Sequence, residues 1–277
     1  METPFVTTDW LSRHLSDANL VILDGSWHMP AANRDAQAEY LAGHIPGAVF
    51  FDIDAIADTS TDLPHMLPAP NDFARMAGAL GLAEDMTIVI YDEAGLFSAP
   101  RVRWTLRTMG AKDVRLLEGG GPQWRAERRA IQSGPVTRAP RTFRASFNPA
   151  NVANFHTVQA RSRDHAAQIA DARAAPRFRG EVPEPRAGLR GGHIPGSVNV
   201  PVGALTVDGK MRPVGELKAL FAEQDLDLDK PIITSCGSGI TASSLALALE
   251  LAGARQVAVY DGSWAEWGGR RDAEVEV

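Results

Sequence analysis

Cysteine is nearly absent from this chain of 277 residues, and Cys236 is its one example. A single thiol excludes intrachain disulfides, a Cys-x-x-Cys redox pair and every zinc site built on several thiolates. No apolar run approaches the ~20 residues that span a bilayer. The first residues, METPFVTTDWLSRHL, also lack a charged segment followed by an apolar core. We therefore expect a protein that spans no membrane and stays in the cytoplasm.

A surplus of basic residues is missing too. The chain has 28 Lys and Arg against 34 Asp and Glu, a net charge of −6, which argues against a nucleic-acid coat or a binder of anionic membranes. Apolar residues make up 44% and charged residues 22%, so disorder and collagen-like structure are excluded. The histidines form no helical i, i+4 pair with a nearby acid, so we expect no metal site.

The chain is an internal duplication. The tetrapeptide HIPG occurs at residues 44–47 and again at 193–196, an offset of 149 residues. An apolar run ending in an acid precedes each copy, at Asp24 and at Asp171. Each copy is followed by a strand-like run, TIVIYD or PIITSC, then by a small-residue loop and a helix-like stretch. Features that recur in the same order predict two related halves.

Short β-branched runs that alternate with helical patterns predict an α/β fold, with a mostly parallel sheet covered by helices on both faces in each half. Between the halves, residues 122–156 hold four prolines and six arginines, with Glu127 the only acid. This segment is interpreted as a solvated connector, because the acidic chain argues against a nucleic-acid strip. We expect domains at 1–124 and 157–277, joined by a linker at 125–156.

The lone thiol stands where a strand ends and a glycine-rich loop begins. Ligands of open parallel sheets bind beyond the carboxyl ends of the strands, and Cys236 closes the run PIITS and opens CGSGITAS. Such a loop can curl so that successive backbone N–H groups converge on one atom. The first half has Asp92 at the matching strand end, so only the second half offers a nucleophile.

The energies favour a loop that stabilises a thiolate. A free cysteine with a pKa of ~8.5 is mostly protonated at neutral pH, and lowering that pKa by about two units takes about 2.7 kcal/mol. A helix terminus supplies only ~0.3–1 kcal/mol, whereas each N–H bond to a charged group supplies ~1.5–3 kcal/mol. The alternative is that Cys236 is a small buried core residue, as free cysteines commonly are.

Phosphoryl chemistry is a second alternative, because cysteine phosphatases use the same strand, cysteine, loop and helix. Those enzymes need an arginine six residues after the cysteine to hold phosphate by two bonds. This chain has Ala242 at that position. The loop therefore lacks the phosphate clamp.

The doubled HIPG, the loop CGSGITA and the segments DGSWAEW and FRGEVPEPR resemble the tandem-domain rhodanese superfamily over nearly the whole chain. In this loop, family members that use 3-mercaptopyruvate have a sequence similar to Cys-Gly-Ser-Gly-(Val/Ile)-Thr. Members that use thiosulfate instead carry basic residues after the cysteine, of the Cys-Arg-Lys-Gly type. Gly237 and Ser238 stand there in this chain. The resemblance implies two rhodanese-like domains, of which the C-terminal one is catalytic.

The resemblance also implies a mechanism without metal or organic cofactor. Cys236 takes sulfur from 3-mercaptopyruvate as a persulfide and releases pyruvate, after which a thiol such as thioredoxin, or cyanide, accepts the sulfur. A thiosulfate sulfurtransferase is the near alternative, and a non-catalytic persulfide carrier or binding module is the more distant one. The site residues that the resemblance implies are the substrate-binding Arg177 and Arg186, the relay Ser238, His65 and Asp54, and the persulfide loop of Gly237, Ser238, Gly239, Ile240 and Thr241.

Overall fold

The computed structural model describes residues 3–277, which form two compact units. The first comprises the residues up to Asp58 together with Leu67–Asn148 and Asp208–Lys210, and the second comprises Thr59–Met66, Pro149–Val207 and Met211–Val277. Each unit contains one five-stranded sheet. The predicted α/β class with a helix-covered sheet in each half is confirmed. The predicted domain boundaries at residues 124 and 157 stay predictions.

The first sheet has the strand order β1-β5-β4-β2-β3, and its strands pair in parallel. Every residue of β2, which lies between β4 and β3, is buried, as expected for a parallel strand covered on both faces. The register places Ile22 opposite Val89. The strands are β1 (Phe5–Val6), β2 (Leu20–Asp24), β3 (Val49–Phe50), β4 (Thr87–Tyr91) and β5 (Asp113–Leu117).

Helices cover both faces of this sheet. Leu11 of α1 and Trp124 of α5 share one core with strand residues such as Ile22 and Val89. The end of α2 lies beside α5, because Arg125 donates to the carbonyl of Gly43. On the other face, α4 packs against β4 and β5, and its Val102 approaches Gly25 together with Ile90 of β4. The helices are α1 (Thr8–His14), α2 (Ala36–Ala42), α3 (Pro70–Ala79), α4 (Ala99–Thr108) and α5 (Gly120–Ala126), with a 3-10 turn η1 (Pro30–Ala32).

The second sheet repeats this topology. Its order is β6-β12-β11-β7-β8, again with parallel pairing, which is the same order as in the first sheet counted from its own first strand. The predicted duplication is therefore present in the fold. The strands are β6 (Val152–Ala153), β7 (Gln168–Asp171), β8 (Val198–Asn199), β11 (Ile232–Ser235) and β12 (Val257–Tyr260), and a two-stranded sheet pairs β9 (Thr206–Val207) with β10 (Lys210–Met211).

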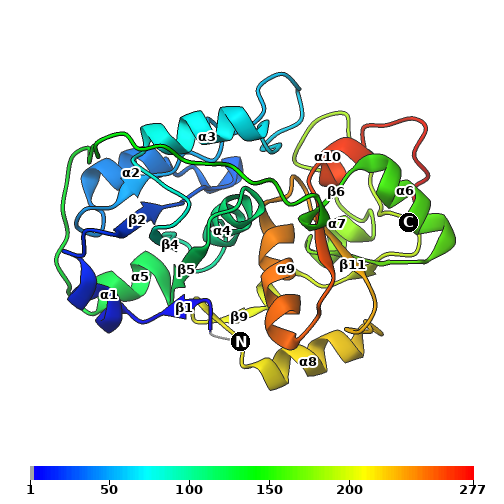
Figure 1. Cartoon of the computed structure of the whole chain (residues 1–277). Helices are drawn as coiled ribbons and strands as arrows, with labels where there is room; N and C mark the ends of the chain where they lie inside the picture. The colour runs from blue at the N-terminus through cyan, green and yellow to red at the C-terminus, as the bar shows by residue number, and fades with distance from the viewer. Residues whose placement is uncertain (1–2) are drawn as a thin grey trace. The chain divides into compact units, whose positions relative to one another are not determined.

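Two helical layers also cover the second sheet. The long helix α9 packs on β11 and β12, with α8 against it (Figure 1). Phe155 of α6 and Trp264 and Trp267 of α10 form a separate core with the strands. The helices are α6 (Phe155–Asp164), α7 (Ala175–Phe178), α8 (Val214–Glu223), α9 (Ile240–Ala252) and α10 (Ser263–Trp267), with 3-10 turns η2 (Pro149–Asn151) and η3 (Val202–Ala204).

The two HIPG turns are structural. His44 stacks on Tyr40 with a centroid distance of 4.2 Å, and its Nδ1 lies 2.8 Å from the Tyr40 carbonyl oxygen. His193 stacks on Phe178 at 3.8 Å, with Nδ1 2.9 Å from the Phe178 carbonyl oxygen. Each histidine also forms a β-bridge with a residue far along the chain, Gln132 or Glu276. The motif thus fixes the turn before a short strand in both units.

The arginine-rich segment after α5 is not a free linker, because it packs on the first unit. Arg141 N–H donates to the Gly78 carbonyl of α3 at 2.9 Å. Phe143 is 3% exposed and lies edge-on to Phe73. Most residues from 125 to 148 are exposed, so the segment is solvated while it lies on the first unit, which ends at Asn148. Its predicted bounds as a linker stay a prediction. In the part of the chain that the structure describes, no helix is both long and apolar enough to cross a bilayer.

Candidate active site

Cys236 lies directly after β11, the central strand of the second sheet, and its side chain is buried. Its main-chain N–H donates to Oγ of Ser263 at 3.2 Å, and its carbonyl accepts the N–H of Trp264 at 2.9 Å. The next carbonyl, of Gly237, accepts the N–H of Ala265 at 2.9 Å. The beginning of α10 therefore fixes the main chain on both sides of the thiol.

The loop after Cys236 turns sharply into α9. Gly239 precedes the helix with φ 81°, in the left-handed region that favours glycine, and Ser238 is 7% exposed. Within residues 3–277, the N–H groups of Gly237 and Ser238 donate to no protein acceptor. Ser238 is buried and Gly237 is half-buried, and donors that are shielded from water need a partner. The loop therefore offers hydrogen bonds to sulfur or to an anion at the positive end of α9.

The corresponding loop of the first unit already holds an anion. Asp92 follows β4 and is 1% exposed. Its Oδ2 accepts N–H groups of Ser98 at 2.9 Å and Ala99 at 2.8 Å, and its Oδ1 accepts that of Ala94 at 3.0 Å. Main-chain amides at this turn can thus surround a negative group, which is the property predicted for the loop of Cys236.

Ser238 and His65 lie together, although 173 residues separate them in the chain. His65 Nδ1 is 3.0 Å from Ser238 Oγ and 3.3 Å from the Ser238 carbonyl oxygen. His65 belongs to the segment Thr59–Met66, which forms part of the second unit, and it has a left-handed φ of 62°. Asp54, the third predicted relay member, belongs to the first unit, where it is exposed and accepts from Trp27 Nε1 at 3.1 Å.

The two predicted substrate-binding arginines converge on Gly237. A Cβ built on this glycine would lie 3.2 Å from Nη2 of Arg177 and 4.0 Å from Nη1 of Arg186. Glycine therefore leaves room for the two guanidinium groups directly beside the cysteine. Arginines suit a planar carboxylate because they can donate two parallel hydrogen bonds. This geometry can hold a small carboxylate next to the Cys236 thiol.

Three further residues of the site escaped prediction from sequence. Ser263 binds the main chain of Cys236, and Glu184 and Arg173 belong to a buried ion-pair network behind Arg177. The available signal was the alternation of arginines and acids in the segment RFRGEVPEPR, which does not show which pair becomes buried. Close by, burial and the neighbouring Glu266 raise the pKa of Tyr260 far above its ordinary value.

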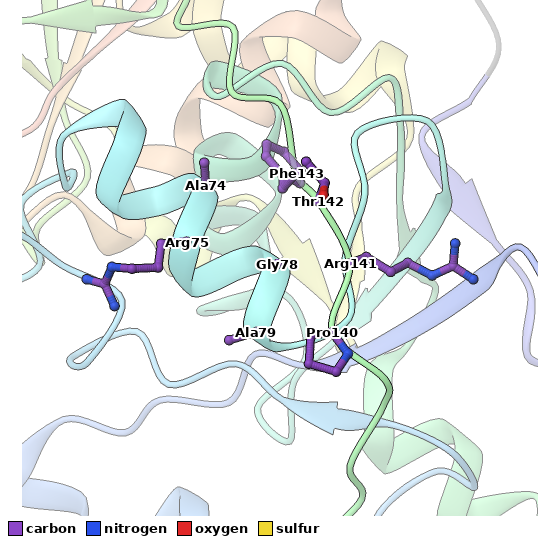
Figure 2. Close-up of a pocket in the computed structure, with 8 residues that line it drawn as sticks. All are labelled: Ala74, Arg75, Gly78, Ala79, Pro140, Arg141, Thr142 and Phe143. Atoms are coloured by element: carbon purple, nitrogen blue, oxygen red, sulfur yellow. The ribbon is translucent and has the colours of Figure 1, made fainter.

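A groove of about 440 Å³ lies elsewhere, in the first unit, between α3 and residues 140–143 (Figure 2). Figure 2 shows the Arg75 and Arg141 side chains extending away from one another on either side of Gly78. Its lining has no nucleophile other than a Thr142 hydroxyl and no titratable acid or histidine. The candidate active site is therefore the Cys236 loop. Across residues 3–277, no cluster of three or more His, Cys, Asp or Glu residues is arranged to hold a metal ion.

The chain is similar to known proteins over nearly its whole length. The model of the rhodanese-like domain matches residues 7–127 and 155–270. The chain is 46% identical to 3-mercaptopyruvate sulfurtransferase of Escherichia coli (strain K12), covering 99% of this chain and 98% of that protein. It is 41% identical to thiosulfate/3-mercaptopyruvate sulfurtransferase 1 of Arabidopsis thaliana, over 99% of this chain and 78% of the relative. Its structure resembles the crystal structure of SseA from Escherichia coli with a TM-score of 0.88 and 44% identity, covering 95% and 99% of the two chains.

Proposed function

We propose that this chain, which belongs to the rhodanese-like domain family, is a sulfurtransferase that takes sulfur from 3-mercaptopyruvate. The observation that carries the proposal is the meeting of Cys236, a loop without basic side chains and two arginines at Gly237. The relatives' names support the same donor.

The reaction uses the thiolate of Cys236 as nucleophile. It attacks the sulfur of 3-mercaptopyruvate, so that an S–S bond forms while the C–S bond of the donor breaks. The electron pair of that bond leaves on pyruvate as an enolate, which then takes up a proton. Cys236 is left as a persulfide, and a thiol or cyanide later removes the outer sulfur and restores the thiolate.

Each surrounding group has a proposed task in these steps. Arg177 and Arg186 bind the donor's carboxylate and keto oxygen, and the free N–H groups of Gly237 and Ser238 stabilise the negative sulfur of the Cys236 thiolate before it attacks. Gly239, Ile240 and Thr241 complete the persulfide loop that leads into α9. The proposed task of Ser238 and His65 is to pass a proton to the enolate, which their separation of 3.0 Å supports. We assign Asp54 to the same relay as a proposal.

The acceptor and the location are two further proposals. A reduced protein thiol such as thioredoxin fits a lone catalytic cysteine, because no second cysteine can resolve the persulfide within the chain. Cyanide is a chemical alternative. Reducing compartments suit a free thiol, which supports the predicted cytoplasmic location.

The test is a steady-state comparison of 3-mercaptopyruvate with thiosulfate as donors, each with reduced thioredoxin and with cyanide as acceptors. We expect turnover with 3-mercaptopyruvate to exceed turnover with thiosulfate by at least about tenfold, because the loop offers no cation to a dianion. Cys236→Ser is expected to abolish pyruvate formation. The reverse donor preference would instead favour a thiosulfate sulfurtransferase. A persulfide detected by mass spectrometry without multiple turnover would indicate a carrier.

A further inference from the structure

A chain of buried charges in the second unit ends at Arg177. Asp171, the last residue of β7, accepts from Arg173 Nη2 at 2.7 Å, and Arg173 Nη1 donates to Glu184 Oε1 at 2.9 Å. Glu184 in turn accepts from Arg177, from Nε at 3.3 Å through Oε1 and from Nη2 through Oε2. The side chains of Asp171, Arg173 and Glu184 are at most 1% exposed, against 18% for Arg177. Only the last member of the chain therefore reaches solvent.

The buried end of this network is fixed to the frame that holds the nucleophile. The Arg173 guanidinium lies 4.2 Å from the centre of the Trp264 ring and also donates to the Gly192 carbonyl at 2.8 Å. Trp264 is the residue whose N–H binds the Cys236 carbonyl. Glu184 is thus held on a rigid support that is continuous with the main chain of Cys236.

Glu184 occupies one edge of the Arg177 guanidinium and leaves the other available. The Nε and Nη2 atoms face the carboxylate of Glu184. Nη1 of Arg177 donates to no acceptor within residues 3–277, and the Cβ position of Gly237 lies 3.2 Å from Nη2 and 3.9 Å from Nη1. The Nη1–Nη2 edge is therefore presented to the loop of Cys236, in the orientation that binds a carboxylate by two parallel bonds.

We propose that Glu184 is a positioning residue for the sulfur-transfer reaction, which holds Arg177 by one edge so that the other receives the carboxylate of the donor. The inference rests on the proposed function. Its physical basis is that a free arginine side chain loses conformational freedom when it binds a ligand, whereas Arg177 is already fixed in position before the donor arrives. The benefit is stronger donor binding from the same guanidinium.

A positioning role and a purely electrostatic role predict opposite changes. As a nearby negative charge, Glu184 repels an anionic donor, so its neutralisation would lower KM. As a support for Arg177, its neutralisation must raise KM, because an amide offers one acceptor where the carboxylate offers two. The direction of the change in Glu184→Gln therefore separates the two roles.

The experiment compares Glu184→Gln with Glu181→Gln in steady-state turnover of 3-mercaptopyruvate. Glu181 is the matched control, because it lies on the same segment and forms an exposed fork with Arg179. We expect KM to rise at least about tenfold in Glu184→Gln, equivalent to about 1.4 kcal/mol, and to stay unchanged in Glu181→Gln. KM does not depend on the fraction of folded enzyme, so partial unfolding would not imitate this result.

A double-variant test shows whether the effect passes through Arg177. In an Arg177→Ala background, which itself is expected to raise KM, Glu184→Gln should cause no further rise. Glu184→Asp retains the charge but withdraws it by one methylene, so it should also raise KM, and it serves where Glu184→Gln fails to fold. An unchanged or lowered KM in Glu184→Gln or Glu184→Asp, or full additivity with Arg177→Ala, would overturn the inference. A wild-type enzyme without turnover would contradict the proposed function instead.

Discussion

At the scale of single residues, Ser263 differs most informatively from its counterpart in the first unit. In the first unit, the N–H of Gly121 donates to the Asp92 carbonyl, and Gly120 precedes Gly121. In the second unit, the N–H of Trp264 donates to the Cys236 carbonyl, and Ser263 precedes Trp264. Both have left-handed φ angles, 57° for Gly120 and 48° for Ser263. Serine is strained there, by roughly 1 kcal/mol or more relative to glycine. The serine hydroxyl accepts the Cys236 N–H and donates to the Tyr260 carbonyl at 2.8 Å, a task that glycine cannot perform.

Two substitutions of Ser263 separate strain from positioning. Ser263→Gly removes the hydroxyl and relieves the strained φ, so its free energy of unfolding should stay close to that of the wild type. Ser263→Ala removes the hydroxyl but keeps the strain, so it should lose about 1–3 kcal/mol. Both should lower kcat for sulfur transfer by about tenfold, because both free the main chain of Cys236.

The measurements are chemical denaturation and steady-state kinetics on the same preparations. If kcat followed stability, so that Ser263→Gly were as active as the wild type, the serine would have no part in positioning Cys236.

At the scale of elements, the loop between β4 and α4 depends on the Asp92 carboxylate. Three main-chain N–H groups, of Ala94, Ser98 and Ala99, converge on it. Asp92→Asn keeps the shape but turns an NH2 group toward at least one of these donors. We expect a loss of about 2–4 kcal/mol in the free energy of unfolding, since hydrogen bonds to a buried charge are lost.

Asp85→Asn is the matched control for this prediction, because it makes the same chemical change at an exposed turn. Equilibrium denaturation in urea, followed by tryptophan fluorescence, gives both midpoints. Equal midpoints for the two variants would show that the Asp92 carboxylate contributes little to the first unit.

Strands and turns that are determined by residues close together in the chain could be predicted from the sequence. The run LVILD of β2 is buried at every position, and the strand-loop-helix turn at Cys236 follows from its glycines. Contacts between distant segments were not predictable, because no local pattern encodes them. His65 reaches Ser238 across 173 residues, and Glu184 is selected over Glu181 for burial by Trp264 and Asp171, which lie elsewhere in the sequence.

At the scale of the whole molecule, duplication has left two units with different electrostatics at the same place. Asp171 at the end of β7 forms an ion pair with Arg173. Asp24 at the end of β2 instead accepts hydrogen bonds from the N–H and the hydroxyl of Ser26. Burial raises the pKa of Asp24 to about 6, even though the hydrogen bonds from Ser26 act in the opposite direction. Among residues 3–277, Asp24 of the first unit forms no ion pair, whereas Asp171 of the second unit pairs with Arg173.

This difference predicts how the stability of the protein changes with pH. The folded-state pKa of Asp24 is about 6 against an ordinary value of 3.8, so the folded protein binds a proton there more tightly than the unfolded chain. The contribution of Asp24 is then fully present below about pH 4, is lost as the pH rises to about 6, and is absent above that. A shift of about two units corresponds to about 3 kcal/mol over this window.

Urea denaturation at intervals from pH 4 to pH 7 measures this change in the free energy of unfolding. Asp24→Asn should remove this fall, because the amide does not titrate, and should make the variant more stable than the wild type above pH 6. Other acids, such as Glu127, whose pKa its hydrogen bonds from Thr8, Gln123 and Arg129 lower to about 2, titrate in both proteins and cancel in the difference. Parallel stability curves for wild type and variant from pH 4 to pH 7 would contradict the prediction, because they would show that the pKa of Asp24 is not raised in the folded protein.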